Sequence, residues 1–338
     1  MRRYRNFEGG FKFIYMNVLS LFDGMSCGMI ALERAGIKVD NYYASEIDKY
    51  AIKVSEANYP KIVRLGDVTK VKVDKGRHID LLIAGSPCQG FSFAGKQLNF
   101  EDPRSKLFFE FVRLLKECRM YNPDVKFLLE NVKMKKEYQD VISGYLGVQP
   151  IEINSALVSA QNRKRLYWTN IDIKGNYPQD KEIFIKDVLE DIPFDKKSES
   201  LNTNPSGRGM NGKIHYGKKS PYLTTNKGEG VKLMDPSTTN NVTTLNPKKP
   251  DGSQTYQQNR IYGIEGKMVC ISAELSGRFN ISDYPKSYNY RKATPIECER
   301  LQTVPDNYTA SVSNSQRYKM LGNGWTVDVI AHIFKYLK

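Results

Sequence analysis

A single cysteine, Cys88, stands just beyond the predicted end of a buried strand. The strand-like run 80–84 is followed by Gly-Ser-Pro, by Cys88, and by a loop of Gly, Ser and Phe in the stretch IAGSPCQGFSFAGK. Enzymes with open α/β sheets place their ligands beyond the carboxyl ends of the strands. A thiolate is intrinsically a strong nucleophile, although only a few per cent of a free thiol is ionised at neutral pH. The position therefore predicts a nucleophile, whereas most intracellular cysteines are inert thiols.

Two further groups of polar residues could act beside this thiol. Glu130 follows two leucines in LLENV, at the predicted end of another buried strand, where a carboxylic acid could hold a proton for donation. Gln161, Arg163 and Arg165 alternate in QNRKR, so both arginines point the same way in an extended segment. Arginine suits planar, multi-donor recognition of a phosphate or a base edge. The alternatives are an ion pair of Glu130 with Lys133 or another base, and an ordinary basic loop.

Three consecutive predicted strands end in residues that fit a nucleoside-like ligand. The turn LFDGMSCG joins a strand to a helix through Gly24 and Gly28, and its backbone N–H groups can face a polar ligand. Glu46 lies about twenty residues further on, where a carboxylate can accept both hydroxyls of a ribose. Asp67 ends the third strand and could accept an adenine amino group. Each acid alone could be a solvated loop residue or a helix cap, but together they predict a cofactor site.

The elements that must position these residues alternate between strand and helix. Strands are predicted at 17–22, 41–48, 61–68, 78–85, 125–132, 150–158 and 165–173, with helices after the first, second, fourth and fifth. This order indicates βαβ units and a mainly parallel, doubly wound sheet. After residue 174 the chain becomes rich in Asn, Thr, Gly, Lys, Ser and Pro, which predicts a smaller, loop-rich β domain. Thr294, Pro295 and Glu297 form a capping box that starts a helix, and a periodic helix follows near the C-terminus.

Composition limits the class of protein and its partners. The 338 residues include 51 Lys and Arg against 37 Asp and Glu, a formal net charge of +14 that fits a polyanionic partner, most simply nucleic acid; a lysine-rich surface of an ordinary cytosolic enzyme is the alternative. The five cysteines are widely spaced without a CxxC pair, and only three histidines occur, which argues against disulfides and a metal site. We expect no membrane span, because no uninterrupted apolar run approaches about 18 residues. A reducing cytosol is the simplest compartment.

The ordered motifs resemble those of the DNA (cytosine-5) methyltransferase family, of prokaryotic or phage type. They are LSLFDGMSCG, SEID, GDV, GSPCQGFSFAGK, ENV, QNRKR, RKATPIECERLQTVPDNYT and LGNGWTVDVIAHI. The resemblance covers residues 17–173 and 291–337. Two departures are GNGW, where the family more often has Gly-Asn-Ser-Val, and Cys270, where a threonine is more usual.

The resemblance implies a Rossmann-like α/β sheet of an S-adenosylmethionine-dependent methyltransferase with a smaller, loop-rich β target-recognition domain. The expected segments are an N-terminal extension over 1–16, a catalytic and cofactor-binding domain over 17–173, a target-recognition domain over 174–290 and a C-terminal segment over 291–338 that completes the catalytic domain.

The same resemblance implies the chemistry. Cys88 would attack C6 of a cytosine, so that C5 can take a methyl group from S-adenosyl-L-methionine and leave S-adenosyl-L-homocysteine, with no metal. Glu130 would bind N3 and N4 of the base, Arg165 would contact the base oxygen and the Cys88 loop, and Arg163 would support it. A base in a duplex must be flipped out to be reached.

Matching positions imply two binding sets. The cofactor set is Phe22, Asp23, Gly24, Glu46, Ile47, Asp67, Val68, Pro87, Leu107, Asn323 and Trp325. The DNA set is Gln89, Ser92, Gln161, Leu223, Thr224, Thr225, Arg260, Cys270 and Ser272. The expected partner is double-stranded DNA, with a cognate restriction endonuclease as a candidate, and the expected state is a monomer in the bacterial cytosol or nucleoid.

Alternative functions come from different classes. A related enzyme of this fold could methylate tRNA, but the long insert 174–290 suits readout of a duplex sequence. A catalytically inactive DNA-binding paralogue is disfavoured by the intact Cys88, Glu130 and Arg165. A restriction-linked enzyme, an orphan enzyme and a phage-borne enzyme all fit the sequence.

Overall fold

The computed structural model describes most of the first half of the chain and its C-terminal part. The described residues are 3–6, 12–85, 106–173, 175–193, 200–202, 214–215, 231–232, 237–239, 242–244, 261–269, 280–282 and 290–337. Within them, no helix is both long and apolar enough to cross a membrane.

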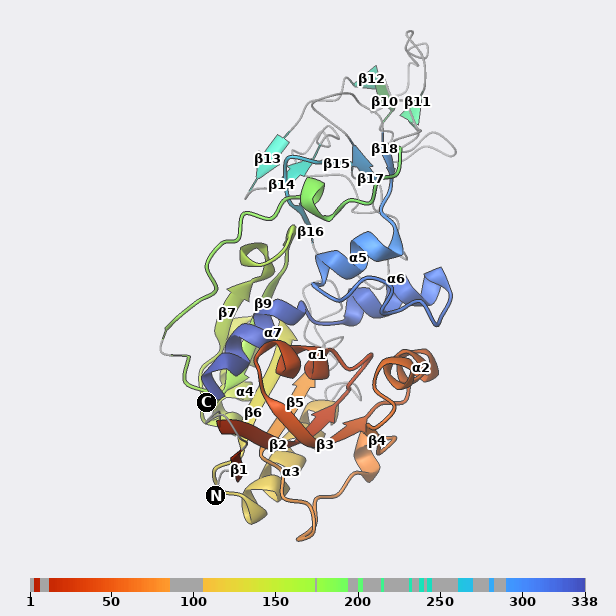
Figure 1. Cartoon of the computed structure of the whole chain (residues 1–338). Helices are drawn as coiled ribbons and strands as arrows, with labels where there is room; N and C mark the ends of the chain where they lie inside the picture. The colour runs from red at the N-terminus through yellow and green to blue at the C-terminus, as the bar shows by residue number, and fades with distance from the viewer. Residues whose placement is uncertain are drawn as a thin grey trace.

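The centre of the molecule is a sheet whose main path has the order β4-β3-β2-β5-β6-β9-β7, with β1 paired to β2 (Figure 1). Its strands are β1 (Arg3–Asn6), β2 (Lys12–Leu21), β3 (Lys38–Ser45), β4 (Val63–Arg64), β5 (Leu81–Gly85), β6 (Lys126–Val132), β7 (Ile151–Asn154) and β9 (Lys164–Thr169). Strands β4, β3, β2, β5 and β6 are parallel, and β9 runs antiparallel to both of its neighbours. The predicted mainly parallel α/β sheet is confirmed.

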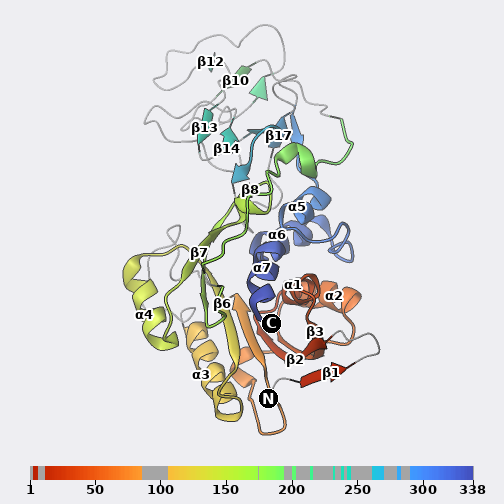
Figure 2. The same ribbon diagram turned by 60° about the vertical axis from the view of Figure 1, so that its left-hand side comes forward.

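Helices cover both faces of this sheet (Figure 2). They are α1 (Cys27–Arg34), α2 (Lys49–Asn58), α3 (Lys106–Tyr121), α4 (Lys136–Leu146), α5 (Pro295–Leu301), α6 (Asn314–Asn323) and α7 (Val327–Phe334). Short 3-10 helices are η1 (Val68–Lys70), η2 (Ser155–Leu157), η3 (Ile185–Val188) and η6 (Lys335–Leu337). The helix α7 lies beside α1, so the end of the chain packs on the same face of the sheet as its first helix (Figure 1).

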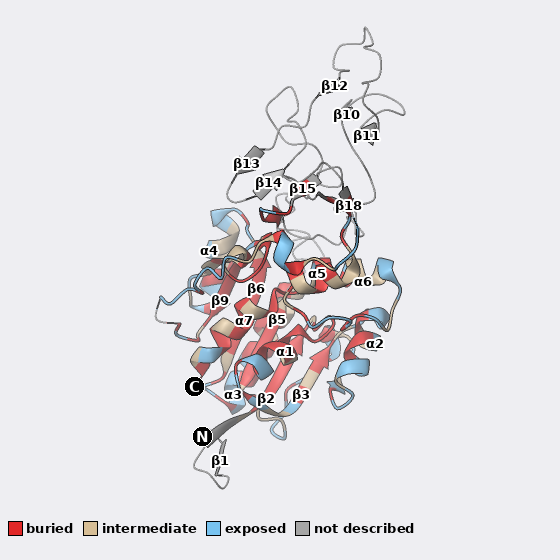
Figure 3. Cartoon of the chain, turned by 45° about the horizontal axis from the view of Figure 1, so that its top comes forward, coloured by how far each residue is buried: buried red, intermediate tan, exposed pale blue. Residues whose placement is uncertain are grey.

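Two apolar cores form because neighbouring residues of a strand point to opposite faces. Val18 and Ile83 face the core that includes α1 and α7, while Leu19 and Leu82 face the core that includes α3 and α4. All four side chains are at most 1% exposed. Both faces of the central strands are therefore buried, as Figure 3 shows.

The sheet differs from the prediction at its margins. Strand β2 begins at Lys12 rather than at residue 17, because β1, within the predicted N-terminal extension, pairs with its first half. The strand predicted over 61–68 is reduced to the two residues of β4, since Gly66 adopts a φ of +70° and turns the chain into η1.

Beyond the main sheet, the described elements from residue 200 to residue 292 are all short strands. They are β10 (Ser200–Asn202), β11 (Ile214–His215), β12 (Val231–Lys232), β13 (Ser237–Thr239), β14 (Val242–Thr244), β15 (Ile261–Gly263), β16 (Met268–Val269), β17 (Asn280–Ser282) and β18 (Tyr290–Lys292). They form a three-stranded and a five-stranded sheet, and β16 pairs with β8 (Gln161–Asn162), which precedes β9 in the chain. These strands lie at one end of the molecule, beyond α5 (Figure 1).

The capping box predicted for α5 is confirmed. The Glu297 backbone N–H donates to the Thr294 hydroxyl (3.1 Å), and the Thr294 N–H donates to the Glu297 carboxylate (2.8 Å). Arg291 also donates to this carboxylate at 2.6 Å, although Glu297 is fully buried. The start of α5 is thus joined to β18, the last strand of the small sheets.

Candidate active site

A cavity of about 620 Å³ lies at the carboxyl ends of β2, β3, β5 and β6. The described members of the predicted cofactor set all line it, from both ends of the chain: Phe22, Asp23, Gly24, Glu46, Ile47, Asp67, Val68, Leu107, Asn323 and Trp325. Glu130, Arg163 and Arg165 line the same cavity. The structure therefore brings the predicted cofactor and catalytic positions together.

Several predicted site residues lie outside the described residues. They are Pro87, Cys88, Gln89 and Ser92 in the predicted catalytic domain, and Leu223, Thr224, Thr225, Arg260, Cys270 and Ser272 in the predicted target-recognition domain.

The turn after β2 adopts an unusual backbone conformation beside the cavity. Phe22, Gly24 and Ser26 have φ values of 55°, 58° and 65°. Left-handed conformations are easy for glycine, but for Phe22 and Ser26 they cost free energy that the surroundings must supply. Such conformations concentrate at ligand sites.

The Asp23 side chain supports this turn from below. It accepts hydrogen bonds from the Ser26 hydroxyl (2.5 Å) and the Tyr42 hydroxyl (2.8 Å), and Arg64 lies 3.6 Å away. Burial raises the pKa of the Asp23 carboxyl above its usual range, although these partners oppose the shift. The side chain is only 1% exposed, so the Asp23 carboxylate cannot contact a ligand directly.

Glu46, at the tip of β3, is fixed by backbone donors. Its Oε2 accepts from the Gly24 N–H (2.7 Å), and its Oε1 accepts from the N–H groups of Ile47 (2.7 Å) and Asp48 (2.9 Å). The next side chain, Ile47, is 76% exposed, although it is apolar and lines the cavity. The tip of β3 thus offers an oriented carboxylate and an uncovered apolar surface.

Asp67 caps η1 with one carboxylate oxygen. Its Oδ1 accepts from the Thr69 backbone N–H (3.0 Å) and hydroxyl (2.9 Å), and these bonds hold the pKa of Asp67 below its usual range. Asp67 is therefore ionised at neutral pH, and its Oδ2 is available as an acceptor.

Glu130 and Arg165 form an ion pair at the other side of the cavity. The Arg165 Nε lies 3.1 Å from the Glu130 Oε1, and the two side chains are 14% and 11% exposed. Lys133 instead pairs with Glu152 at 2.8 Å. The base that pairs with Glu130 is therefore Arg165 and not Lys133.

Arg163 lines the cavity but holds the backbone that carries two other predicted residues. It is 4% exposed and donates to the carbonyl oxygens of Gly322 (3.3 Å) and Gly324 (3.0 Å). Asn323 lies between these carbonyls and Trp325 follows them. The geometry therefore gives Arg163 a positioning task in the cavity wall.

Gln161 does not fit the predicted contact with DNA. Its side chain is fully buried, and its Nε2 donates to the Leu301 carbonyl (2.6 Å) and to the Gln302 Oε1 (2.9 Å). A side chain with no exposed surface cannot reach a nucleotide, so this expectation is corrected. Gln161 anchors the strand that leads to Arg163.

Sequence reasoning missed Lys267, which is only 1% exposed. Its ammonium group donates to the carbonyl oxygens of Ala156 and Ser159, the latter at 3.4 Å, and lies 3.5 Å from Asp180. The following strand β16 pairs with β8, which precedes Arg163. A buried lysine thus fastens the segment 261–269 to the strand that enters the cavity, but no local sequence signal marks it.

Three cysteines of the described residues are unsuited to nucleophilic attack. Cys27, Cys118 and Cys298 are buried free thiols. Burial raises the pKa of Cys27 and of Cys118 to about 12, and it raises that of Cys298 as well. These thiols are almost wholly protonated at neutral pH.

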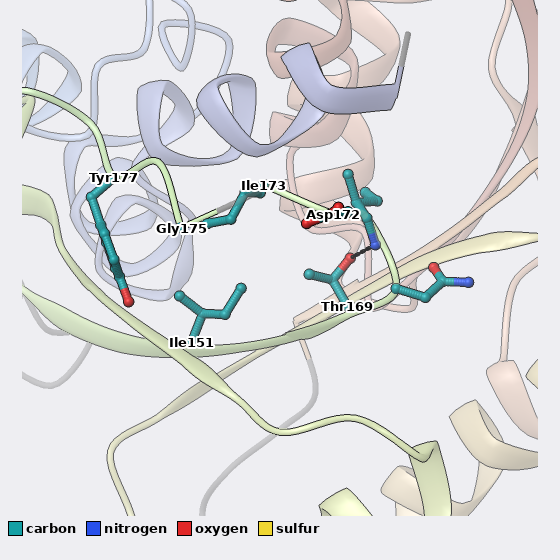
Figure 4. A pocket seen from close by; sticks show the side chains of 8 residues that line it. Ile151, Thr169, Asp172, Ile173, Gly175 and Tyr177 are labelled. Atoms are coloured by element: carbon teal, nitrogen blue, oxygen red, sulfur yellow. Dashed lines mark hydrogen bonds between the residues drawn. The ribbon is translucent and has the colours of Figure 1, made fainter.

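A second cavity, of about 360 Å³, contains none of the predicted site residues. Figure 4 shows it between Ile151, Ile173 and Tyr177, near the far end of β9. The Thr169 hydroxyl beside it already donates to the Phe127 carbonyl (2.5 Å) and accepts from the Ile171 N–H (3.0 Å).

Comparisons with known proteins match nearly the whole chain. The family model for C-5 cytosine-specific DNA methylases matches residues 16–143 and 144–338. The orphan methyltransferase M.SPRI of Bacillus phage SPR is 31% identical in an alignment that covers 95% of this chain and 97% of that protein. The type II methyltransferase M.HhaI of Haemophilus parahaemolyticus is 30% identical over 337 residues, which cover 94% of this chain and 93% of that protein.

Solved structures share the fold. The Entamoeba histolytica methyltransferase EhMeth aligns with a TM-score of 0.65 and 18% identity, over 96% of this chain and 98% of that one. A DNMT2 variant of Spodoptera frugiperda aligns with a TM-score of 0.60 and 17% identity, over 95% and 99%. At such identities the likeness bears on the fold alone.

Proposed function

Because the chain belongs to the C-5 cytosine-specific DNA methylase family and is a DNA (cytosine-5) methyltransferase, we propose that it transfers a methyl group from S-adenosyl-L-methionine to C5 of a flipped-out cytosine. The cytosine lies at a specific sequence of duplex DNA, and the reaction passes through a covalent bond between Cys88 and C6. The supporting observation is one cavity lined both by the predicted cofactor positions and by the Glu130–Arg165 ion pair.

The cavity fits S-adenosylmethionine in size and in chemistry. Its volume of about 620 Å³ lies within the range of small-molecule sites. Glu46 is oriented to accept ribose hydroxyls, and Asp67 keeps a carboxylate oxygen available for an adenine amino group. Phe22 and the exposed Ile47 offer apolar surface to the purine ring. When bound, this cofactor supplies an electrophilic methyl group on a positively charged sulfur.

The covalent connection keeps Cys88 close to the ion pair. Cys88 follows Gly85 by three residues, and Gly85 is the register partner of Glu130 in the sheet. Three residues span at most about 11 Å, so the thiol and the Glu130 carboxylate can contact the same six-membered ring. This distance limit supports a shared role, with Cys88 below C6 and Glu130 at the N3–N4 edge.

In the proposed reaction, the Cys88 thiolate forms a bond to C6 and the electron pair of the C5–C6 double bond becomes available at C5. Glu130 takes up a proton from solvent as the base binds, holds N3 and N4 and passes this proton to N3, while Arg165 orients the resulting carboxylate and contacts the base oxygen. After C5 has taken the methyl group, its proton leaves to water. The C6–S bond then breaks and the N3 proton returns to Glu130, which restores the double bond and frees Cys88.

The direct test is transfer of a tritiated methyl group to duplex DNA and to tRNA, with the Cys88→Ala variant as the control. We expect labelled duplex DNA with the wild-type protein and no label above background with the variant. Label in tRNA alone would contradict the proposed substrate, and label in neither nucleic acid would contradict the proposed activity.

Glu46→Ala is expected to weaken S-adenosylmethionine binding about tenfold to a hundredfold and to leave DNA affinity unchanged. The substitution removes the acceptor of the ribose hydroxyls and leaves three backbone N–H groups without their partner, and hydrogen bonds to charged groups contribute about 1.5–3 kcal/mol each. Calorimetry measures the cofactor affinity, and fluorescence anisotropy measures the DNA affinity. Glu56→Ala, at an exposed position of α2, is the matched control. Unchanged cofactor affinity of Glu46→Ala would remove this residue from the site.

Exchange of residues 174–290 tests whether this segment selects the DNA sequence. We expect a chimera that carries the corresponding segment of a relative with another specificity to methylate the relative's site. Within the segment, substitution of a lysine that contacts phosphate should weaken binding to all DNA sequences alike and reduce the slope of the salt dependence of binding by about one. Substitution of a residue that reads a base should instead cost ~1–3 kcal/mol of binding free energy at one base pair. Bisulfite sequencing of host DNA identifies the methylated sites. An active chimera that keeps the original site would place recognition elsewhere in the chain.

A further inference from the structure

We propose that the indole ring of Trp325 forms the wall against which the positively charged sulfonium of S-adenosylmethionine rests. This contact strengthens binding of the charged cofactor relative to that of the uncharged product, S-adenosylhomocysteine. The inference rests on the proposed use of this cofactor.

Trp325 lies at the junction of the cofactor positions and the base-binding pair. It lines the cavity, and its Nε1 lies 2.8 Å from the point that a Cβ atom on Gly85 would occupy. The Glu130 Oε2 lies 3.5 Å from the same point. The ring is therefore pressed against the end of β5, close to the carboxylate proposed to hold the cytosine.

The methyl group must be delivered near this end of the cavity. Glu46 and Asp67 at the tips of β3 and β4 fit the ribose and the adenine, whereas Glu130 holds the acceptor base in the proposed reaction. The sulfur that carries the methyl group must then lie between these two ends. Among the described lining residues, Trp325 is the aromatic residue packed against Gly85, next to Glu130.

The ring is held in place by its neighbours. Arg163 fixes the carbonyls of Gly322 and Gly324, the residues on either side of Asn323. The Thr326 hydroxyl that follows donates to the Gln302 Oε1 at 2.9 Å. A ring positioned in this way can contact a ligand without a large loss of side-chain freedom on binding.

The carboxylates at this end of the described lining are already neutralised or turned away. Glu130 pairs with Arg165 at 3.1 Å, and Asp48 pairs with Lys319 at 3.1 Å. The Asp23 carboxylate is 1% exposed and lies in the hydrogen-bond network below the turn. An aromatic face attracts a cation within about 6 Å of its centroid, so the indole supplies the electron-rich surface that these carboxylates do not.

The test is calorimetric titration of the full-length chain with S-adenosylmethionine, S-adenosylhomocysteine and sinefungin, in which a charged amine replaces the sulfonium. Wild-type protein is compared with Trp325→Leu, which keeps apolar bulk without a π system, and with Trp325→Phe, which keeps a smaller one. Leu107→Ala, at another apolar residue of the cavity wall, is the matched control. The melting temperature of each unliganded variant shows that it is folded.

We expect Trp325→Leu to weaken binding of the two charged ligands about tenfold and to leave S-adenosylhomocysteine nearly unchanged, because cation–π contacts at desolvated sites correspond to roughly twofold to thirtyfold in affinity. Trp325→Phe should recover part of the difference, and Leu107→Ala should weaken all three ligands alike. Equal losses for all three ligands with Trp325→Leu, or no loss, would overturn the inference. If Trp325→Leu is unfolded, Trp325→Phe decides by the same comparison of charged and uncharged ligands.

Failure of the inference is distinguishable from failure of the proposed function. If wild-type protein binds neither S-adenosylmethionine nor S-adenosylhomocysteine, the proposed cofactor is wrong. If it binds both and the variants keep the wild-type ratio of the two affinities, only the role of Trp325 is wrong.

Discussion

Cys88→Ser should lower the rate of methyl transfer by on the order of a thousandfold or more, while binding of S-adenosylmethionine persists. The hydroxyl of serine is a far weaker nucleophile than a thiolate unless an adjacent base activates it. The side chains nearest the proposed base position are Glu130, whose carboxylate pairs with Arg165, and the arginines themselves. A serine at residue 88 would therefore have no free base to remove its proton.

Cys118→Ser is the matched control for this substitution. Cys118 is 1% exposed in α3, and burial raises the pKa of its thiol to about 12. The control should keep full activity and lose about 1–3 kcal/mol of stability, because the buried hydroxyl must find a hydrogen-bond partner.

The measurement that separates covalent catalysis from mere binding uses duplex DNA with 5-fluorocytosine at the target. Fluorine takes the place of the C5 proton and cannot leave as a cation after methyl transfer, so the bond between Cys88 and C6 should persist as a protein–DNA species on a denaturing gel. Wild-type protein and Cys118→Ser should form this species, and Cys88→Ser should not. A stable adduct in Cys88→Ser would identify another nucleophile.

The positions of the cavity residues could be predicted because parallel strands end at one edge. Glu130 follows an apolar run typical of a strand buried on both faces, and Glu46 and Asp67 lie at the predicted ends of two further strands. Once the strands are parallel, residues that are far apart in sequence must meet at the carboxyl edge of the sheet. The sequence therefore predicted the members of the site without any knowledge of their distances.

The tasks of individual side chains could not be predicted because they depend on distant partners. Gln161 and Arg163 share the motif with Arg165, but the acceptors of Gln161 lie about 140 positions further along the chain, near Leu301. The Asp23 carboxylate lies beneath the turn because it accepts a hydrogen bond from the Tyr42 hydroxyl and lies near the Arg64 guanidinium there. Alternation places a residue on a face of a strand, but only the packed structure shows which group it contacts.

The second large effect is expected for Glu130→Gln. The amide has nearly the same shape as the carboxyl group, but it cannot donate a carboxyl proton to N3 and cannot form an ion pair with Arg165. Loss of a general acid or base costs typically 10²–10⁴-fold, so we expect a fall of this size in the single-turnover rate of methyl transfer. Cofactor affinity should remain near the wild-type value, since the adenosine contacts lie at the tips of β3 and β4.

Glu152→Gln is the matched control. Glu152 lies on β7, and it pairs with Lys133 at 2.8 Å, so the same change removes an ion pair next to the sheet edge without touching the cavity lining. Its methyl-transfer rate should stay within about twofold of wild type, because exposed ion pairs contribute little to stability. A Glu130→Gln rate that equals the Glu152→Gln rate would mean that the Glu130–Arg165 pair is structural.

A double-mutant cycle then decides what Arg165 does. If Arg165 only orients the Glu130 carboxylate, Arg165→Met should lower the rate as much as Glu130→Gln, and the double variant should lose no more than either single one. If the guanidinium also contacts the base oxygen, that contact survives in Glu130→Gln, so the double variant should be slower than both. The second result is expected, because Arg165 contacts Glu130 through its Nε (3.1 Å) and the Lys164 carbonyl through its Nη1 (2.9 Å), so Nη2 is the atom that we expect to contact a bound base.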